Sequence, residues 1–557
     1  MHKIVLTLKK KIAFIGVLAL TLVAVSFGVQ QLISIYDQGD HLLPPLPRHA
    51  DIPTKSRMTY AESLKLGFPA DSRAMPTTSC ASQSNNWQAN ENGNPGVAMD
   101  PQTWHDLHLF LPTGSVLWTN RTTATCGDVI KVHASMFGGD PADNAPRTIK
   151  VMRIGYYNGS GARELWSSQP MQLKRYNVPR VKNLTRMVET NWPVTATFTI
   201  GKDWTPGLYA VATLDVKGTV ENMYPLIVKG QVGASKLLFV HSTITWAAYN
   251  SFGGRSAYMG PINPVQERSR VVSMDRPILG SGINHFDRDA IAPIQFFEER
   301  GIQVDQIADT DLDRNPSILT HYSGVIFSGH AEYMTHRIFK TLMAARNNGI
   351  NFAFLGSNTA YWQVRLESSP SGSDRRVAIY RDPQTDPVTD PELVSIQFNN
   401  SRINLLPSLI TGETTAGVHV VGDMKLIDKP SWLIIPTDAH LNGWSANTEI
   451  DSAVVGNFAP PKSHIIFSGK FKLTRLPKSS RAMNSLITAR SYVGQTIWFT
   501  TPSGSAIFVA GVNYWACELS YTCMEGNVNE STRLVLQSVT EQVLTLWQTK
   551  AVGRTLK

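Results

Sequence analysis

The sequence predicts an α/β protein with a doubly wound, mostly parallel sheet, preceded by an Ig-like β-sandwich and an N-terminal transmembrane helix. Three observations predict this fold class. Residues 12–36 contain no charged side chain, as is typical of a membrane-spanning helix. Between residues 80 and 229, short alternating apolar runs are separated by Gly, Pro and Asn, which favours a β-sandwich. After residue 236, short apolar runs alternate with amphipathic stretches, the pattern of strands and helices in a parallel sheet.

The apolar run at the N-terminus is long enough to cross a bilayer as a helix. At a rise of about 1.5 Å per residue, its 25 residues exceed a hydrocarbon core of roughly 30 Å. Lysines at positions 9–11 precede the run, whereas Asp37 and Asp40 follow it. The positive-inside rule therefore predicts a signal-anchor helix over residues 1–37 and places the bulk of the chain outside the cytoplasm, in the periplasm or at the cell surface. The alternative is a cleaved signal peptide and a secreted chain.

Three further segments follow the predicted anchor. Residues 38–79 are rich in Pro and polar side chains without a sustained periodicity, which indicates a stalk. The Ig-like β-sandwich is expected over residues 80–230, and the α/β domain over residues 231–557. The strands expected in the sandwich cover residues 129–134, 149–157, 195–200, 208–214 and 224–228.

The α/β domain is predicted from its alternating elements. Gly301 and Gly349 each follow an amphipathic stretch, where a glycine commonly ends a helix. Two apolar runs near residue 500 predict a β-hairpin, and the chain is expected to close on an amphipathic helix. The strands are expected at residues 237–240, 303–307, 324–327, 351–355, 496–499 and 506–510, and the helices at residues 291–300, 334–347 and 534–548.

Charge and cysteine content limit the classes of partner. The formal net charge is +9, but the lysines and arginines are scattered among acidic residues. Without a recognition motif or a basic patch, we expect no nucleic acid partner. The four cysteines form an even set that suits an oxidising compartment. Their spacing favours Cys517 with Cys523 and Cys80 with Cys126, although the sequence alone is compatible with three connectivities.

Polar residues follow three of the expected strands. In open α/β sheets, ligands bind outside the carboxyl ends of the strands. The polar tips cover residues 242–254, 328–333 and 356–358. The second tip offers His330 and Glu332 rather than a Ser or Cys, which suits a metal ligand with an adjacent acid or base better than an acyl-enzyme nucleophile. The alternative is that both residues cap the helix expected to begin near Met334.

Several stretches, taken in order, resemble the large (beta) subunit of N,N-dimethylformamidase and its relatives. The resemblance runs from about residue 125 to residue 366 and continues more faintly to the C-terminus. It implies a glutamine-amidotransferase-like sheet for the C-terminal domain. The matching stretches are Ile154–Gly159, Gly161–Arg163, Trp204–Tyr209, Thr245–Asn250, Phe252–Gly254, Tyr258, Ser273, Arg276–Pro277, Gly329–Tyr333, Phe354–Asn358, Tyr361–Trp362 and Arg365.

The resemblance also implies a metal site. In that family a mononuclear non-haem iron is held by two tyrosines and one glutamate, which would here be Tyr209, Tyr249 and Glu332. Their hard oxygen donors suit an oxidised ion, Fe3+. His330 and Asn358 are the expected catalytic residues, His330 as proton carrier to the leaving amine and Asn358 as a partner of the oxyanion or the water. The alternative is that both tyrosines only pack in the protein interior.

The function expected from this resemblance is iron-dependent hydrolysis of carbon–nitrogen amide bonds other than peptide bonds. A metal-bound hydroxide would attack the polarised carbonyl of a small-molecule amide. The chain departs from the enzyme in its predicted anchor and disulfides, in the little room before the β domain, and in Met334, where relatives usually have Trp. Dimethylformamide is therefore not the substrate we expect. The alternatives are a non-catalytic cell-surface protein that binds a glycan or a protein, and a hydrolase of esters or glycans with another metal. Homo-oligomerisation is left open.

Overall fold

The structure of this chain, a computed structural model, describes residues 48, 52–72, 86–99, 114–138, 143–179, 181, 184–260, 267–444, 448–473, 491–523, 526 and 528–556. The transmembrane span predicted at residues 12–36 lies outside these residues. Within the described ranges, no helix combines the length and the apolarity that a membrane crossing requires.

Part of the segment predicted as a stalk lies against the C-terminal half of the chain. Lys55 and Met58 donate backbone hydrogen bonds to Ser401 and Asn404. The short helix α2 (Tyr60–Ser63) follows, and its N-cap Thr59 forms a capping box with Glu62. Described residues of this segment therefore have specific partners on the body of the protein.

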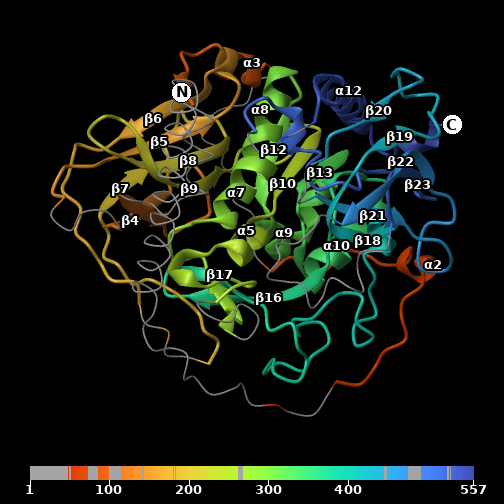
Figure 1. Ribbon diagram of the computed structural model, residues 1–557, viewed down its shortest axis with the longest axis horizontal. Helices are drawn as coiled ribbons and strands as arrows, with labels where there is room; N and C mark the ends of the chain where they lie inside the picture. Colours follow the sequence, from red (N-terminus) through yellow and green to blue (C-terminus); the bar gives the residue numbers. More distant parts are fainter. Residues whose placement is uncertain are drawn as a thin grey trace, which may run out of the picture.

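The first half of the described chain is built from two β-sheets (Figure 1). Strand predictions are confirmed here, because each predicted run overlaps an observed strand. Buried side chains from both sheets belong to one hydrophobic core, to which Ile130, Val151, Phe198 and Leu208 contribute. The six-stranded sheet has the order β1 (Val97–Ala98), β6 (Gly161–Ser167), β5 (Thr148–Ile154), β8 (Gly207–Leu214), β9 (Val220–Val228) and β3 (Thr123–Ala124), and the three-stranded sheet has the order β2 (Ser115–Thr119), β4 (Val129–Met136) and β7 (Ala196–Thr199).

The second half contains an eleven-stranded sheet. Its first five strands are parallel neighbours, in the order β12 (Val304–Ala308), β10 (Leu237–His241), β13 (Gly324–Gly329), β15 (Asn351–Gly356) and β24 (Ala506–Val509). The sheet then continues with antiparallel strands, in the order β23 (Ser491–Thr500), β22 (His464–Leu473), β18 (Glu413–Gly422) and β21 (Thr448–Ala453). The strands β19 (Met424–Leu426) and β20 (His440–Leu441) pair beside this path.

The predicted fold class, a doubly wound and mostly parallel α/β sheet of the glutamine-amidotransferase type, is wrong. Strands hold 33% of the residues and helices 21%, and the sheets are mixed or antiparallel. The alternation of strand and helix on which the prediction rested does occur between residues 237 and 356. After residue 370 the chain forms hairpins, which need only short turns, and their antiparallel strands extend the same sheet. The alternation of strand and helix is therefore a local feature of residues 237–356 and does not extend through the whole domain.

A four-stranded sheet and several helices lie around the parallel strands. The smaller sheet has the order β11 (Val271–Ser273), β17 (Gly372–Ala378), β16 (Trp362–Ser369) and β14 (Tyr333–Thr335). Three helices confirm sequence predictions, namely α8 (Ala292–Glu299), α10 (His336–Asn347) and α12 (Glu530–Trp547). The other elements that matter below are α5 (Thr243–Tyr249), α7 (Ser281–Phe286), the π-helical turn η4 (Asp287–Ile291) and α9 (Asp309–Arg314).

The N-cap of α10 excludes the interpretation that His330 and Glu332 only cap this helix. Thr335 is the N-cap residue, and its hydroxyl accepts a hydrogen bond from the backbone N–H of Ile338 over 3.0 Å. His330 and Glu332 lie further back along the chain, before β14. The helix is therefore capped without them.

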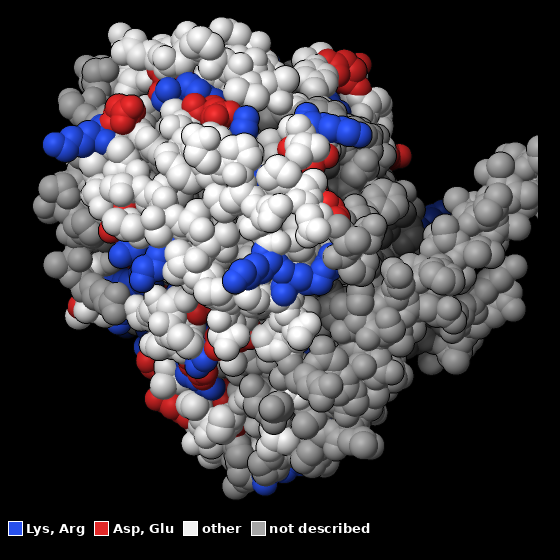
Figure 2. All heavy atoms as spheres, turned by 90° about the vertical axis from the view of Figure 1, so that its left-hand side faces the viewer, with Lys and Arg blue, Asp and Glu red and all other residues white. Residues whose placement is uncertain are grey.

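Two ion pairs join the two halves of the chain, and the first of them is buried. Arg153 on β5 donates to Glu298 on α8 over 2.6 Å, and the two side chains are 0% and 3% exposed. Lys229, just after β9, pairs with Asp311 on α9 over 2.7 Å. On the face seen in Figure 2, small groups of basic side chains are interspersed with acidic ones. That face therefore has no broad patch of one charge among its described residues.

One predicted disulfide is confirmed. Cys517 and Cys523 are bonded, with their Cα atoms 5.4 Å apart. Cys126 is described and Cys80 is not, so the pairing of these two residues stays a prediction. The boundaries predicted at residues 79 and 230 also stay predictions.

Candidate functional site

The ends of three parallel strands bring the predicted polar tips together. β13 pairs with β10 on one side and with β15 on the other. The segments that follow these strands carry Tyr249 at the end of α5, Glu332 between β13 and β14, and Asn358 after β15. Because parallel strands end at the same edge of a sheet, these residues lie on one side of it.

Three oxygen-bearing side chains meet at this edge. The phenol of Tyr249 donates to Oε2 of Glu332 over 2.8 Å, and the phenol of Tyr258 donates to Oε1 of the same carboxylate over 2.5 Å. The two phenol oxygens are 3.2 Å apart. Glu332 is 2% exposed, and both tyrosines are partly buried. The cluster therefore presents two phenols and a carboxylate at one point.

The protonation of this cluster depends on nearby positive charge. Burial, and then the carboxylate of Glu332, raises the pKa of Tyr249 and Tyr258 well above the usual value of a phenol. Burial also raises the pKa of Glu332. These groups therefore resist ionisation while no cation lies among them, and a bound cation would favour their anionic forms.

Tyr209, the third ligand expected from the sequence, lies in a different environment. It is fully buried on β8, where its phenol donates to the carbonyl of Thr205 over 2.6 Å and its ring stacks on Trp204 with the centroids 5.5 Å apart. Burial raises its pKa well above the usual value. Among the described residues, no hydrogen bond or ring contact joins Tyr209 to Tyr249 or Glu332.

His330 and Asn358 belong to a hydrogen-bonded chain centred on Glu449, a residue of β21. Nε2 of His330 lies 2.9 Å from Oε2 of Glu449, and Nδ2 of Asn358 donates to the same oxygen over 2.9 Å. Burial by itself lowers the pKa of His330, but the carboxylates of Glu449 and Glu332 raise it to about 9. Burial by itself raises the pKa of Glu449, and His330 then lowers it below its usual value. The pair is therefore ionised at neutral pH.

A second histidine, His285, packs against the tyrosine cluster. His285 on α7 lies with its ring centroid 4.3 Å from that of Tyr249, and its Nδ1 is 2.7 Å from Oδ2 of Asp289. Burial, followed by the charge of Arg288, lowers the pKa of His285 to about 4. Asp289 also accepts a hydrogen bond from the backbone N–H of His330 over 3.3 Å. His285 is therefore a neutral packing partner that fixes the ring of Tyr249.

Tyr258 and Glu449 are candidate site residues that were not predicted from the sequence. Tyr258 belongs to a stretch that resembles the family, and the chain turns back there because the backbone N–H of Ala257 donates to the carbonyl of Ala248 over 2.9 Å. That turn brings Tyr258 beside Tyr249, nine positions earlier, with the ring centroids 4.5 Å apart. Glu449 lies on an antiparallel strand far along the chain, and no local pattern indicates its position.

The oxygen donors fit a hard cation of high charge. Phenolate and carboxylate oxygens are hard ligands, and the three could supply up to three negative charges. Each phenol contacts its own carboxylate oxygen, over 2.5 and 2.8 Å, and the two phenol oxygens are 3.2 Å apart, so these side chains would be the ones to hold such an ion. In the described part of the chain, no group of three or more His, Cys, Asp and Glu side chains is arranged to hold a metal ion. The cluster differs in kind, because two of its donors are phenols.

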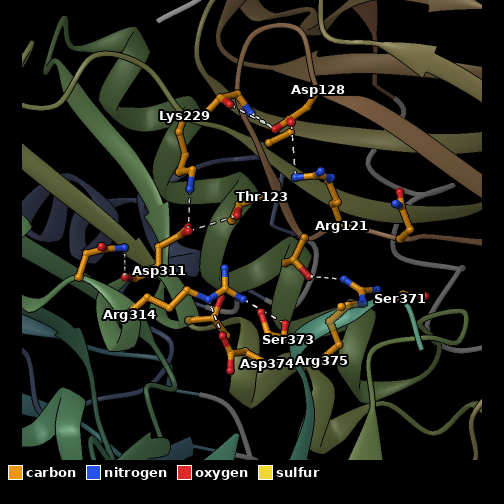
Figure 3. A pocket seen from close by; sticks show the side chains of 17 residues that line it. Arg121, Thr123, Asp128, Lys229, Asp311, Arg314, Ser371, Ser373, Asp374 and Arg375 are labelled. Atoms are coloured by element: carbon orange, nitrogen blue, oxygen red, sulfur yellow. Dashed lines mark hydrogen bonds and ion pairs between the residues drawn. The ribbon is translucent and has the colours of Figure 1, made fainter. Parts of the chain in front are cut away.

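A polar cavity of about 540 Å³ lies elsewhere, where β3 and β9 meet α9 and the start of β17 (Figure 3). Opposite charges in its wall pair with one another. Lys229 pairs with Asp311 over 2.7 Å, and Arg121 with Asp128 over 3.4 Å. Its lining contains none of the residues of the tyrosine cluster. We therefore do not place the candidate functional site in this cavity.

A buried oxygen-rich cluster beside an ionised His–Glu pair, at the ends of parallel strands, is the arrangement expected of an enzyme active site. A comparison with protein families also indicates an enzyme. The family model for "N,N-dimethylformamidase beta subunit-like, C-terminal" matches residues 148–529, which is more than half of the chain and includes every residue of the cluster. The chain belongs to this family, and the resemblance seen in the sequence is confirmed. Membership supports a dimethylformamidase-like amide hydrolase in general terms. A comparison with curated proteins found no match.

Proposed function

We propose that the protein is an iron-dependent hydrolase of carbon–nitrogen amide bonds in small molecules, and that Tyr249, Tyr258 and Glu332 are its metal ligands. One observation carries the proposal. The phenols of Tyr249 and Tyr258 lie within hydrogen-bonding distance of each other, and each bonds to a different oxygen of the Glu332 carboxylate, in a chain of the dimethylformamidase family. Tyr258 takes the place that the sequence analysis gave to Tyr209. A bound ion would supply Lewis-acid polarisation of the amide carbonyl and would lower the pKa of water.

The chain's own residues account for proton transfer and orientation. Nδ1 of His330 is buried and has no hydrogen-bond partner among the described residues, while Nε2 is fixed by Glu449. We propose that Nδ1 gives a proton to the departing nitrogen as the oxygen of water joins the carbonyl carbon and the C–N bond breaks, and that the proton lost by the water restores the charged imidazole. Asn358 is fixed at both ends of its amide, by Glu449 and by the hydroxyl of Thr415 over 2.8 Å, and it orients the water or the carbonyl oxygen.

Metal analysis of single variants tests the ligand set. We expect about one iron per wild-type chain and loss of the iron in Tyr249→Phe, Tyr258→Phe and Glu332→Gln. Tyr209→Phe is the matched control, because it also removes one buried phenol, and it should keep the iron. Absorption in the visible range, which arises from charge transfer between phenolate and ferric iron, should follow the iron content and provides a readout that does not depend on activity.

The opposite results would reject specific parts of the proposal. Loss of iron in Tyr209→Phe with retention in Tyr258→Phe would restore the ligand set inferred from the sequence. A wild-type chain that binds no iron would favour the non-catalytic binding protein. With iron bound, hydrolysis of a panel of small amides should fall at least about 100-fold in His330→Gln, as expected when a general acid is removed. Hydrolysis of the matching esters instead of the amides would reject the proposed bond specificity.

We also propose that the enzyme works outside the cytoplasm, held by the N-terminal helix. The disulfide between Cys517 and Cys523 supports an oxidising compartment. Fractionation of cells that express the full chain tests this location. The intact chain should stay with the membrane fraction, and a soluble chain lacking its first residues would contradict the anchor.

A further inference from the structure

An arginine lies at the partly exposed rim of the proposed active site. The guanidinium of Arg381 stacks on the ring of Tyr258 at 4.1 Å and on the ring of Trp362 at 4.5 Å, measured from Cζ to the ring centroid. It also donates to the phenol of Tyr333. Because Tyr258 is one of the proposed metal ligands, Arg381 contacts the proposed metal site directly. Cation–π stacking on two rings fixes the plane of the guanidinium.

Arg381 lacks the acidic partner that Arg153 and Arg375 each have. Arg153 pairs with Glu298, and Arg375 pairs with Asp275 over 2.5 Å. No carboxylate among the described residues pairs with Arg381, and its buried Nε has no acceptor there. A buried donor without an acceptor costs free energy. The backbone of Arg381 is also left-handed, with a φ of +61°, which is uncommon for a residue other than glycine.

Two more arginines add positive charge to the same place. Arg268 donates to the carbonyls of Ile379 and Tyr380, the residues just before Arg381, over 3.0 and 2.6 Å. Burial, followed by the charges of Arg270 and Arg381, lowers the pKa of Arg268 to about 8. Nε and Nη1 of Arg270 are buried and have no acceptor among the described residues. The backbone N–H of Ile379 donates to the carbonyl of Arg270 over 2.6 Å, which brings the two segments together.

From this geometry we infer that Arg381 is a specificity-determining residue that binds a carboxylate on the substrate. The substrates are therefore small amides that carry a carboxylate group near the scissile bond, and uncharged amides are poor substrates. This inference rests on the proposed function of the same site. A guanidinium binds a planar carboxylate through two parallel N–H···O bonds, and the unpaired Nε of Arg381 is one of the donors needed. Arg268 and Arg270 raise the local positive potential and attract the anion.

A matched pair of probes tests the inference. N-formylglycine and N-formylglycinamide contain the same formamide bond and differ in the carboxylate. Their binding to the purified full chain is measured by isothermal titration calorimetry, with the iron content determined on the same samples. We expect the wild type to bind N-formylglycine at least about 10-fold more tightly. Arg381→Gln should remove this preference while changing the affinity for N-formylglycinamide by less than about twofold. These fold-changes correspond to about 1.4 kcal/mol per factor of ten.

Two further variants separate recognition from a structural role. Arg381→Lys keeps the charge but loses the planar pair of donors, and it should retain only part of the preference. Arg121→Gln removes one exposed arginine from the polar cavity of Figure 3, outside the proposed site, and it should bind both probes like the wild type. This control also has the same net charge as Arg381→Gln.

The outcomes distinguish this inference from the proposed function. Equal affinity of the wild type for the two probes, or no detectable binding of either at millimolar concentration, overturns the inference. An equal loss of affinity for both probes in Arg381→Gln also overturns it, because a structural residue would act in that way. A clear preference for N-formylglycine without iron or turnover would support carboxylate recognition and reject the hydrolase. Turnover of uncharged amides without any preference for a carboxylate would support the hydrolase and reject carboxylate recognition.

Discussion

Gly329 allows the end of β13 to approach Asp289 closely. Its φ is +57°, and a Cβ added there would lie 2.0 Å from Oδ1 of Asp289. We expect Gly329→Ala to lower the free energy of unfolding by about 3 kcal/mol or more, since it combines an unfavourable φ with a steric clash. It should also displace His330, whose backbone N–H donates to Asp289. Urea denaturation measures the loss.

The control for this prediction is Gly301→Ala. Gly301 has a φ of +68°, but an added Cβ would meet no atom within 4 Å. The variant isolates the backbone strain, which we expect to cost about 1 kcal/mol. Equal losses in the two variants would show that the contact with Asp289 has no effect of its own.

The buried ion pair of Arg153 and Glu298 gives a second prediction for stability, which single substitutions test. Arg153→Met leaves the carboxylate of Glu298 buried without its partner, and we expect it to lower the free energy of unfolding by about 3–5 kcal/mol. The partly exposed pair Lys150 and Glu164, whose side chains are 30% and 32% exposed, provides the comparison. Lys150→Met should cost at most about 1 kcal/mol. Similar values for the two variants in urea denaturation would mean that burial of the first pair does not determine its effect.

The positions of candidate site residues were predictable where they adjoin a strand end. His330, Glu332 and Asn358 follow β13 and β15 directly, and the rule that ligands bind at the carboxyl ends of parallel strands indicates them. Glu449 reaches the same point from an antiparallel strand of distant sequence, and no spacing predicts that contact. Tyr209 and Tyr258 both belong to stretches that resemble the family. The ligand set predicted with Tyr209 stays a prediction. The turn that pairs Ala257 with Ala248 brings Tyr258 beside Tyr249, and that turn depends on tertiary structure.

At the scale of elements, the disulfide holds the segment that precedes α12. Cys517 and Cys523 close a loop across a sequence separation of six residues, and both are nearly fully buried. Chain entropy for a loop of this length gives a stabilisation of about 2 kcal/mol. The double variant Cys517→Ser, Cys523→Ser should lower the free energy of unfolding by about that amount. Reduction of the wild type by dithiothreitol is the independent control. A loss under 0.5 kcal/mol in both experiments, an order-of-magnitude threshold, would contradict the prediction.

Elements were predictable where the apolar period was strong and a terminator was present. The run before Gly301 corresponds to α8, and the run before Gly349 to α10. The strand predicted at residues 351–355 corresponds to β15. The weaker region after residue 370 contains β18 and β22, in which buried and exposed positions follow no strict alternation. Bulges shift the register there, and a shifted register removes the period on which a sequence-based prediction depends.

At the scale of the whole molecule, ion pairs join the strands of the first half to the helices of the second half. Arg153 and Lys229 place charges from the first half beside carboxylates of α8 and α9. Sequence patterns predict which strands form but not which strands become neighbours, and strand order determines whether a sheet is parallel or mixed. The fold class was therefore wrong although most of its strands and helices were correct.

The pH dependence of unfolding tests the core that surrounds the parallel strands. Asp309 accepts hydrogen bonds from the hydroxyl of Thr243 over 2.5 Å and from the backbone N–H of Ile244 over 3.0 Å. Burial raises its pKa to about 7, whereas the unfolded chain has a value near 3.9. The folded state therefore keeps a proton that the unfolded state releases, and stability falls as the pH rises from about 4 to about 7. Relative to Asp309→Asn, which mimics the protonated carboxyl, the wild type should lose about 1 kcal/mol per pH unit in this window. Asp203→Asn, at an exposed position, is the control for the removal of one carboxylate. Parallel profiles for the wild type and Asp309→Asn would mean that Asp309 is already ionised in the folded protein at low pH, and that its hydrogen bonds outweigh its burial.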